Sequence, residues 1–124
     1  MTKWLWIDAS YNKNFRLEEE IASAFDLDPR EVARVMCERN ILGSTQIADD
    51  ITLPHVELSH LRYQGIAWIK YDSSFALVLV IDKEKPSRSV VDKLGFILEE
   101  EHLKLMRQVN SQQMLEEVLK NAGR

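Results

Sequence analysis

The stretch GIAWIKYDSSFALVLVI, residues 65–81, decides the fold of this 124-residue chain. Its first part, residues 65–71, alternates apolar and polar side chains well enough to predict a strand. Residues 74–81 are apolar on both faces, which predicts a central strand that is covered on both sides. The spacer Asp72-Ser73 fits a tight hairpin between the two strands.

Helical patterns precede this hairpin. Apolar residues in 17–25 fall on one helical stripe, and a run of glutamates faces water. In the next segment, Asp28 is a typical N-cap and Pro29 suits the first helical position. Glu31 completes a capping-box pattern with Asp28, so we expect a second helix there.

Further helices are predicted after the hairpin. A helix is expected from about residue 87 to residue 100, and residues 102–109 fit either a helix or a short strand. Ser111 is expected to cap a final amphipathic helix. The inner face of the first of these helices is predicted to consist of Val90, Val91, Leu94, Ile97 and Leu98.

The order of elements predicts the fold class. Residues 51–56 are predicted to form one more strand, after a loop over residues 43–50. Strands therefore lie in the middle of the chain and helices towards both ends. We predict an α/β fold, a mixed β-sheet flanked by helices on both faces in a single domain. Residues 1–16 are expected to be an N-terminal extension or edge strand, and residues 17–124 the main domain.

Composition excludes several classes of function. The formal charge is -4, from 16 Lys and Arg against 20 Asp and Glu, which argues against direct nucleic-acid binding. Cys37 is the single cysteine, so disulfides and multi-cysteine zinc sites are excluded, and we expect it to be buried. The longest apolar run, residues 75–81, is too short to span a bilayer, and the N-terminus does not resemble a secretion signal. We therefore expect a cytoplasmic protein without membrane insertion.

His55 is the strongest candidate for chemistry. It follows Pro54 directly, at what the pattern predicts to be the end of a strand. A histidine nucleophile must be partly exposed and held in one tautomer, and a phosphoryl group on it needs nearby donors. Ser44 and Thr45 in the preceding loop could supply such donors. The alternative is a strand-end histidine that only satisfies a hydrogen bond.

Other polar residues near His55 offer weaker sites. His55, Glu57 and His60 could in principle bind a metal, but their spacing matches no common metal motif, and we expect neither a metal nor a cofactor. Asp49 and Asp50 could act as general acid or base, although turn residues are the more common role. Trp4, Trp6 and Trp68 fit the core or an interface better than a ligand site, and a homodimer is left open.

Arg39 ends the capped helix, just before the loop that leads to His55. Its guanidinium could reach a phosphate bound at the histidine. The alternative is a surface arginine that stabilises the C-terminus of the helix. Residue type alone does not decide between these two roles.

Taken together, residues 39–55, RNILGSTQIADDITLPH, resemble the signature of the enzyme IIA domains of the mannitol/fructose class in the bacterial sugar phosphotransferase system. The order of elements downstream of His55 is also similar to that of the family, and the resemblance covers about residues 17–120. The positions that match the signature in register are Arg39, Gly43, Ser44, Thr45, Ile47, Pro54 and His55.

The resemblance implies a phosphotransferase component. In the family, the histidine at the position of His55 accepts a phosphoryl group from the phosphocarrier protein HPr. It then passes the group to a IIB domain, which phosphorylates the incoming sugar. The residue that matches the family's phosphate-holding arginine is Arg39. The resemblance thus names HPr and a IIB domain as partners.

The chain also departs from the family pattern. Asn40 replaces a glutamate, and Ser87 stands where we align the family's second histidine. Ser87 can still donate a hydrogen bond to a phosphate, but it cannot share a proton as imidazole does. The glycines of the family's turn are replaced by Gln46, Ala48 and Asp50.

Three functions stay open at this point. The first is a phosphoryl carrier that acts through His55. The second is a regulatory IIA-like domain of a sugar-responsive transcription regulator, where slow transfer is sufficient. The third is a non-catalytic adaptor of the same fold, in which His55 is inert. The sequence identifies neither the sugar nor the oligomeric state.

Overall fold

The central hairpin consists of β5 (Gln64–Lys70) and β6 (Phe75–Asp82), which pair antiparallel. Tyr71 N donates to Ser74 O at 2.8 Å and closes the turn. Between Gly65 and Ile69, and again between Ala76 and Asp82, every residue is buried. The predicted central strand with two covered faces is therefore confirmed. The computed structural model describes residues 1–121 of the chain.

Four more strands extend the sheet within these residues. On the outer side of β5, β1 (Thr2–Asp8) runs parallel to it and forms one edge. On the outer side of β6 lie β3 (Ile51–Thr52) and then β4 (His55–Leu58), both parallel to β6. Finally, β2 (Gln46–Ala48) pairs antiparallel with β3. The sheet is mixed, as the sequence predicts.

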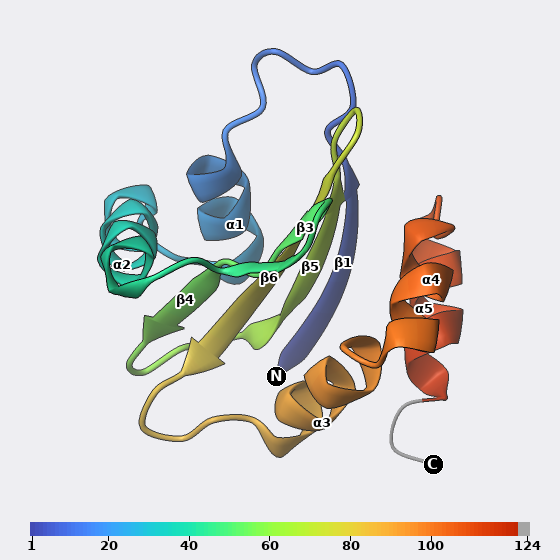
Figure 1. Cartoon of the computed structure of the whole chain (residues 1–124). Coiled ribbons are helices and arrows are strands. Elements are labelled where there is room, and N and C mark those ends of the chain that lie inside the picture. Colours follow the sequence, from blue (N-terminus) through green and yellow to red (C-terminus); the bar gives the residue numbers. More distant parts are fainter. Residues whose placement is uncertain (122–124) are drawn as a thin grey trace.

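Helices cover both faces of this sheet (Figure 1). On one face lie α1 (Leu17–Phe25) and α2 (Pro29–Leu42). On the other lie α3 (Arg88–Ile97), α4 (Glu100–Arg107) and α5 (Gln112–Lys120). Each face has its own buried core, because successive side chains of a strand point to opposite sides. The predicted α/β class, a mixed sheet with helices on both faces in one domain, is confirmed.

Caps define where the helices begin. The side chain of Asp28 accepts a hydrogen bond from Arg30 N at 2.9 Å, and Pro29 is the first residue of α2. The predicted capping box is wrong in one respect, because the carboxylate of Glu31 binds Arg34 at 2.7 Å. As predicted, Ser111 caps α5 through its hydroxyl.

Three further expectations about α2–α5 are settled by the structure. Residues 102–109, which fitted a helix or a strand, belong mainly to the helix α4. Val91 and Leu98 do not belong to the inner face of α3, since they are 47% and 37% exposed. The single cysteine, Cys37, is exposed on α2 rather than buried.

The β1 edge of the sheet is covered by one side chain of α5. The amide of Gln112 accepts a hydrogen bond from Trp6 N at 2.8 Å and donates one to Trp4 O. These backbone groups would otherwise be free to pair with a strand of another molecule. Residues Thr2–Asp8 thus form an edge strand of the sheet. Within residues 1–121, none of the helices has the length and apolar character needed to span a bilayer.

The predicted strand over residues 51–56 is interrupted at Leu53 and Pro54. Proline has no N–H to donate, so the ladder along β6 stops there and resumes at His55. Leu53 N donates to Thr45 O at 2.8 Å, and Pro54 O accepts from Leu79 N at 2.9 Å. His55 therefore begins a strand rather than ending one. The predicted loop over residues 43–50 contains β2, which packs beside this break.

Candidate functional site

A cavity of about 250 Å³ lies between α2 and β4. The lining residues from α2 recur at spacings of three and four positions, so they lie on one side of the helix. From the sheet the cavity receives residues of β4 and the residue that follows β6. The lining residues are Arg34, Val35, Glu38, Arg39, Leu42, His55, Glu57, Leu58 and Lys83.

His55 stands at the start of β4 and lines this cavity. The register with β6 pairs His55 with Leu79, and Pro54 fixes the backbone just before it. Its side chain is 23% exposed, so the ring is neither sealed in the core nor fully in solvent. Nδ1 lies 3.5 Å from Oε1 of Glu57, which projects from the same side of the strand. The imidazole is thus accessible to solvent, and its Nδ1 side faces the carboxylate of Glu57.

The surroundings of His55 lower its pKa below the usual value. Partial burial is the main cause, and the positive charge of Arg39 acts in the same direction. The carboxylate of Glu57 opposes both effects. Since the ordinary pKa of histidine lies near 6.5, the ring is mostly neutral at pH 7. A neutral imidazole has one ring nitrogen with a free lone pair, as a nucleophile requires.

Arg39 lies in the last turn of α2 and reaches the same cavity as His55. The helix ends at Leu42, and the φ of +150° at its C-cap, Gly43, favours glycine because other residues rarely adopt it. Arg39 Nη1 donates to the carbonyl of Gly43 at 3.4 Å. Within residues 1–121, Arg39 takes part in no ion pair with a carboxylate. Its charge is therefore available to an anion in the cavity.

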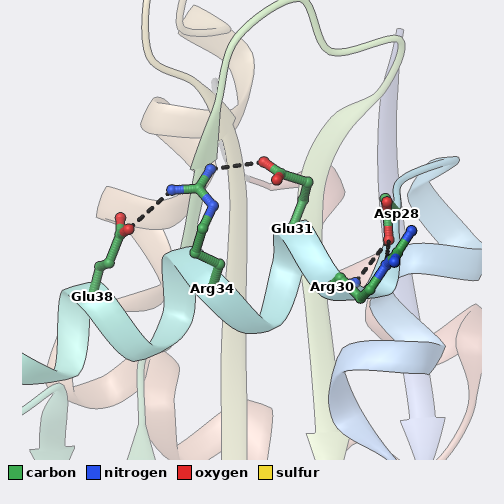
Figure 2. A network of polar contacts seen from close by, with 5 residues as sticks. All are labelled: Asp28, Arg30, Glu31, Arg34 and Glu38. Carbon is green, nitrogen blue, oxygen red and sulfur yellow. Dashed lines mark hydrogen bonds and ion pairs between the residues drawn. The ribbon is translucent and has the colours of Figure 1, made fainter.

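A second arginine of the cavity, Arg34, is already occupied. Its guanidinium binds Glu31 at 2.7 Å and Glu38 at 2.9 Å, one turn before and one turn after it on α2 (Figure 2). Both carboxylates raise the pKa of Arg34. The two negative charges offset the positive charge of Arg34. Arg34 therefore attracts an anion in the cavity less strongly than Arg39 does.

Three predicted phosphate ligands lie outside the lining of this cavity. Ser44 uses its hydroxyl locally, as the acceptor of Gln46 N at 3.1 Å. Thr45 contributes its carbonyl to the break between β3 and β4. Ser87 caps α3, and its own N–H donates to Gln64 Oε1 at 2.8 Å. The structure thus brings Arg39 and His55 together, but not these three residues.

Asp50 and His60 also lie away from the cavity. Asp50 binds Arg107 of α4 through two hydrogen bonds of 3.0 Å, which lower the pKa of the carboxyl group. This pairing favours a structural role over acid–base chemistry. The side chain of His60 is 88% exposed and faces Glu84 at 4.0 Å. The alternative metal site of His55, Glu57 and His60 does not assemble.

The described residues contain one group of metal-type ligands, Glu99, Glu101 and His102, whose ligand atoms lie within 4.8 Å of one another. Both glutamates are exposed. His102 Nδ1 lies 2.6 Å from the carbonyl of Phe96, and its ring stacks on that side chain. These contacts explain the position of His102 without a metal.

Lys83, Arg34 and Glu38 complete the cavity, although sequence reasoning did not single them out. Lys83 directly follows β6, and no carboxylate within residues 1–121 pairs with it. The signal for the two α2 residues was present in the sequence, since Arg34 and Glu38 lie one turn apart on the stripe that also contains Arg39. That stripe becomes a site only through its packing against β4.

Comparison with known proteins finds similarity at the level of structure. No protein-family model and no curated protein sequence matches the chain. A similar solved structure is the crystal structure of nitrogen regulatory protein IIA-Ntr from Neisseria meningitidis, with a TM-score of 0.68 and 16% sequence identity. The match covers 93% of this chain and 92% of that one. This chain has a IIA-type fold.

The likeness extends over nearly the whole of both chains. At 16% identity it establishes the fold and leaves the chemistry to the site. The similar protein is a nitrogen regulatory IIA protein, so the comparison supports the IIA fold in general. The mannitol/fructose class inferred from residues 39–55 stays a prediction.

Proposed function

We propose that this chain is a phosphoryl-accepting IIA-like domain of the phosphotransferase system, phosphorylated on His55. The observation that carries the proposal is the placement of His55 and Arg39 in one cavity. There the imidazole is partly exposed, and the guanidinium has no carboxylate partner among residues 1–121. The IIA-type fold supports the same conclusion, because it makes proteins of the phosphotransferase system the natural partners.

The proposed reaction moves a phosphoryl group between two nitrogen atoms. The lone pair of the neutral His55 ring forms the new N–P bond while the N–P bond of the donor breaks. The electron pair of that bond returns to the imidazole of the donor. No proton has to be transferred for this exchange, so the protein contributes mainly position and charge. Arg39 neutralises part of the negative charge that the phosphoryl oxygens bring into the cavity.

HPr is the proposed donor and a IIB domain the proposed acceptor. A second, regulatory reading is favoured by one structural observation. The hydroxyl of Ser87, aligned with the family's second histidine, caps α3 instead of lining the cavity. With fewer phosphate ligands the transfer would be slower, which a regulatory domain tolerates. The similar solved structure is that of a nitrogen regulatory protein, which agrees with this alternative.

Phosphorylation is tested by incubating the chain with enzyme I, HPr and phosphoenolpyruvate, followed by measurement of the intact mass. We expect a gain of one phosphoryl group that is lost in His55→Ala. The matched control is His60→Ala, which removes the far more exposed histidine and should leave the gain unchanged. If His55→Ala still gains the group, or wild type gains none, the proposal is wrong.

The two forms of the proposal are separated by onward transfer. A carrier passes the phosphoryl group to a IIB domain at least as fast as sugar is taken up. Its own label therefore disappears when that domain is added. A regulator retains the label under the same conditions. A third class, an inert adaptor, acquires no label in the first place.

A further inference from the structure

We propose that Glu57 is the residue that positions His55, by holding the proton on Nδ1 so that Nε2 is the phosphoryl acceptor. This inference rests on the proposed function of His55, and it adds a residue that the resemblance to IIA domains did not name. Glu57 takes no part in binding the phosphoryl group itself. It acts on the reaction through the ring of His55.

The backbone of β4 brings the two side chains together. His55 and Glu57 are separated by one residue on a strand, so both project from the same side. The parallel register with β6 fixes both positions, since His55 pairs with Leu79 and Glu57 with Ile81. Nδ1 and Oε1 are 3.5 Å apart, and the carboxylate is half exposed, so the two groups face each other at the edge of hydrogen-bond distance.

The other charges around the ring leave this role to Glu57. The helix α2 presents Arg34, Glu38 and Arg39 to the cavity, and Lys83 follows β6. Glu38, the second carboxylate of the cavity, is already bound to Arg34 at 2.9 Å. Among the described residues, Glu57 is therefore the free carboxylate that faces His55, and nothing in residues 1–121 binds Nε2.

The chemistry of the transfer gives this contact a purpose. A neutral imidazole carries its proton on one nitrogen and its lone pair on the other, and a hydrogen bond at Nδ1 selects which is which. When Nε2 forms the bond to phosphorus, the ring becomes positively charged. A carboxylate beside Nδ1–H stabilises that charge, as the aspartate does for the histidine of a serine protease. The same carboxylate lies on the Nδ1 side, away from the acceptor nitrogen.

The position of the proton is measured directly by nitrogen NMR of histidine-labelled, unphosphorylated protein at a pH where His55 is neutral. In wild type we expect Nδ1 to give the signal of a protonated ring nitrogen and Nε2 that of an unprotonated one. Glu57→Gln retains a side-chain oxygen that accepts from Nδ1–H and should keep this pattern. Glu57→Val removes the acceptor and should shift the population towards Nε2–H.

The matched control is Glu84→Val, which removes the same charge beside the exposed His60 and should leave the His55 signals unchanged. A wild-type ring that is protonated on Nε2 would overturn the inference. An unchanged proton position in Glu57→Val would overturn it as well. Thermal unfolding of each variant separates these effects from a loss of folding.

The kinetic arm uses the phosphorylation rate from HPr at saturating donor. We expect Glu57→Val to lower that rate about tenfold, the lower end of the effect seen when a metal-binding histidine loses the partner that orients it. Glu57→Gln should restore most of the rate, because it keeps the orientation without the charge. Equal rates in wild type and Glu57→Val would contradict the positioning role.

The two arms keep the outcomes apart. If the NMR pattern is as expected but no phosphoryl group is accepted, the function proposed for His55 fails while the hold of Glu57 on its ring stands. If the group is accepted at full rate by all variants, the function stands and the role of Glu57 fails.

Discussion

His55 Nδ1 lies 3.5 Å from Glu57 Oε1 at the start of β4, while the charge of Arg39 acts on the same ring from α2. The carboxylate raises the pKa of His55 and the guanidinium lowers it. Burial adds to the effect of Arg39, and the net result is a lowered pKa. The imidazole is therefore held neutral by its surroundings and oriented by one neighbour, which are the two conditions for a nitrogen nucleophile.

The first prediction concerns pH. Because the pKa of His55 is lowered, the phosphorylation rate should stay level from pH 8 to neutrality and fall only when the pH drops through that lowered pKa. Arg39→Ala removes a positive neighbour and should raise the pKa, and Glu57→Gln should lower it further. Proton NMR titration of the His55 ring measures both shifts. Shifts of the opposite sign would show that these neighbours do not control the ring.

The second prediction compares the two arginines of the cavity. Arg39→Ala should slow phosphorylation on the order of a hundredfold, as expected for loss of a group that stabilises charge in the transition state. Arg34→Ala should have a much smaller effect, because Glu31 and Glu38 already offset its charge. Both rates are measured by intact-mass analysis of samples quenched at successive times, with phosphorylated HPr in excess.

Folding is the control for this comparison. Neither guanidinium is buried in the core, so the free energy of unfolding should change little in either variant. The role of Arg39 is contradicted if both variants label at the wild-type rate, or if the loss of rate follows the loss of stability.

The third prediction concerns two exposed apolar residues beside the cavity. Ile41 and Leu42 end α2 and are 79% and 81% exposed, and Leu42 is also part of the lining. These two apolar side chains are adjacent in sequence and exposed next to a reactive group, which makes them candidates for a docking surface. The double variant Ile41→Ser, Leu42→Ser should raise the KM for phosphorylated HPr several-fold and leave kcat nearly unchanged.

A small phosphoryl donor such as phosphoramidate separates docking from chemistry. Such a donor needs no protein surface, so the double variant should react with it at the wild-type rate. A rate that falls equally with both donors would assign Ile41 and Leu42 to the structure of the site rather than to docking.

The fourth prediction tests the pairing that fixes the β2–β3 turn to α4. Asp50→Asn should destabilise the fold by roughly 1 kcal/mol at neutral pH, since both side chains of the pair are about one-third exposed. Arg107 lowers the pKa of Asp50, so this contribution is present above the usual aspartate range and is lost as pH falls through the lowered pKa. Thermal melts of the variant and wild type should therefore converge in acid.

Asp49→Asn provides the matched comparison, because Asp49 is exposed and forms no ion pair among residues 1–121. It should melt like wild type at every pH. A difference between Asp50→Asn and wild type that is the same at all pH values would argue against the ion pair as its cause.

Local patterns made most of the fold predictable. The hairpin of β5 and β6 is encoded by two apolar runs and the short spacer Asp72-Ser73, all within one stretch. Asp28 and Ser111 marked the starts of α2 and α5, because capping depends on residues only a few positions away. The break between β3 and β4 depends instead on the pairing with β6, which is far away in sequence and is interrupted at Pro54.

The candidate site was predictable only in part for the same reason. His55 and Arg39 were found through a short motif, and the structure places them in one cavity. Lys83 lines the cavity because it directly follows β6, and this position depends on the sheet. Glu57 was considered from the sequence only as a metal ligand. Ser87 was aligned with the family's second histidine across the loop that precedes α3, and the structure uses its hydroxyl to cap α3.

The most direct measurement is the location of the phosphoryl group on the wild-type chain. After incubation with enzyme I, HPr and phosphoenolpyruvate, the protein is digested and mapped by tandem mass spectrometry at alkaline pH, where the N–P bond survives. The account predicts that the label lies on the peptide that contains His55, and on its imidazole. A label on another residue, or a chain that stays unlabelled while a known IIA domain is labelled in parallel, would contradict it.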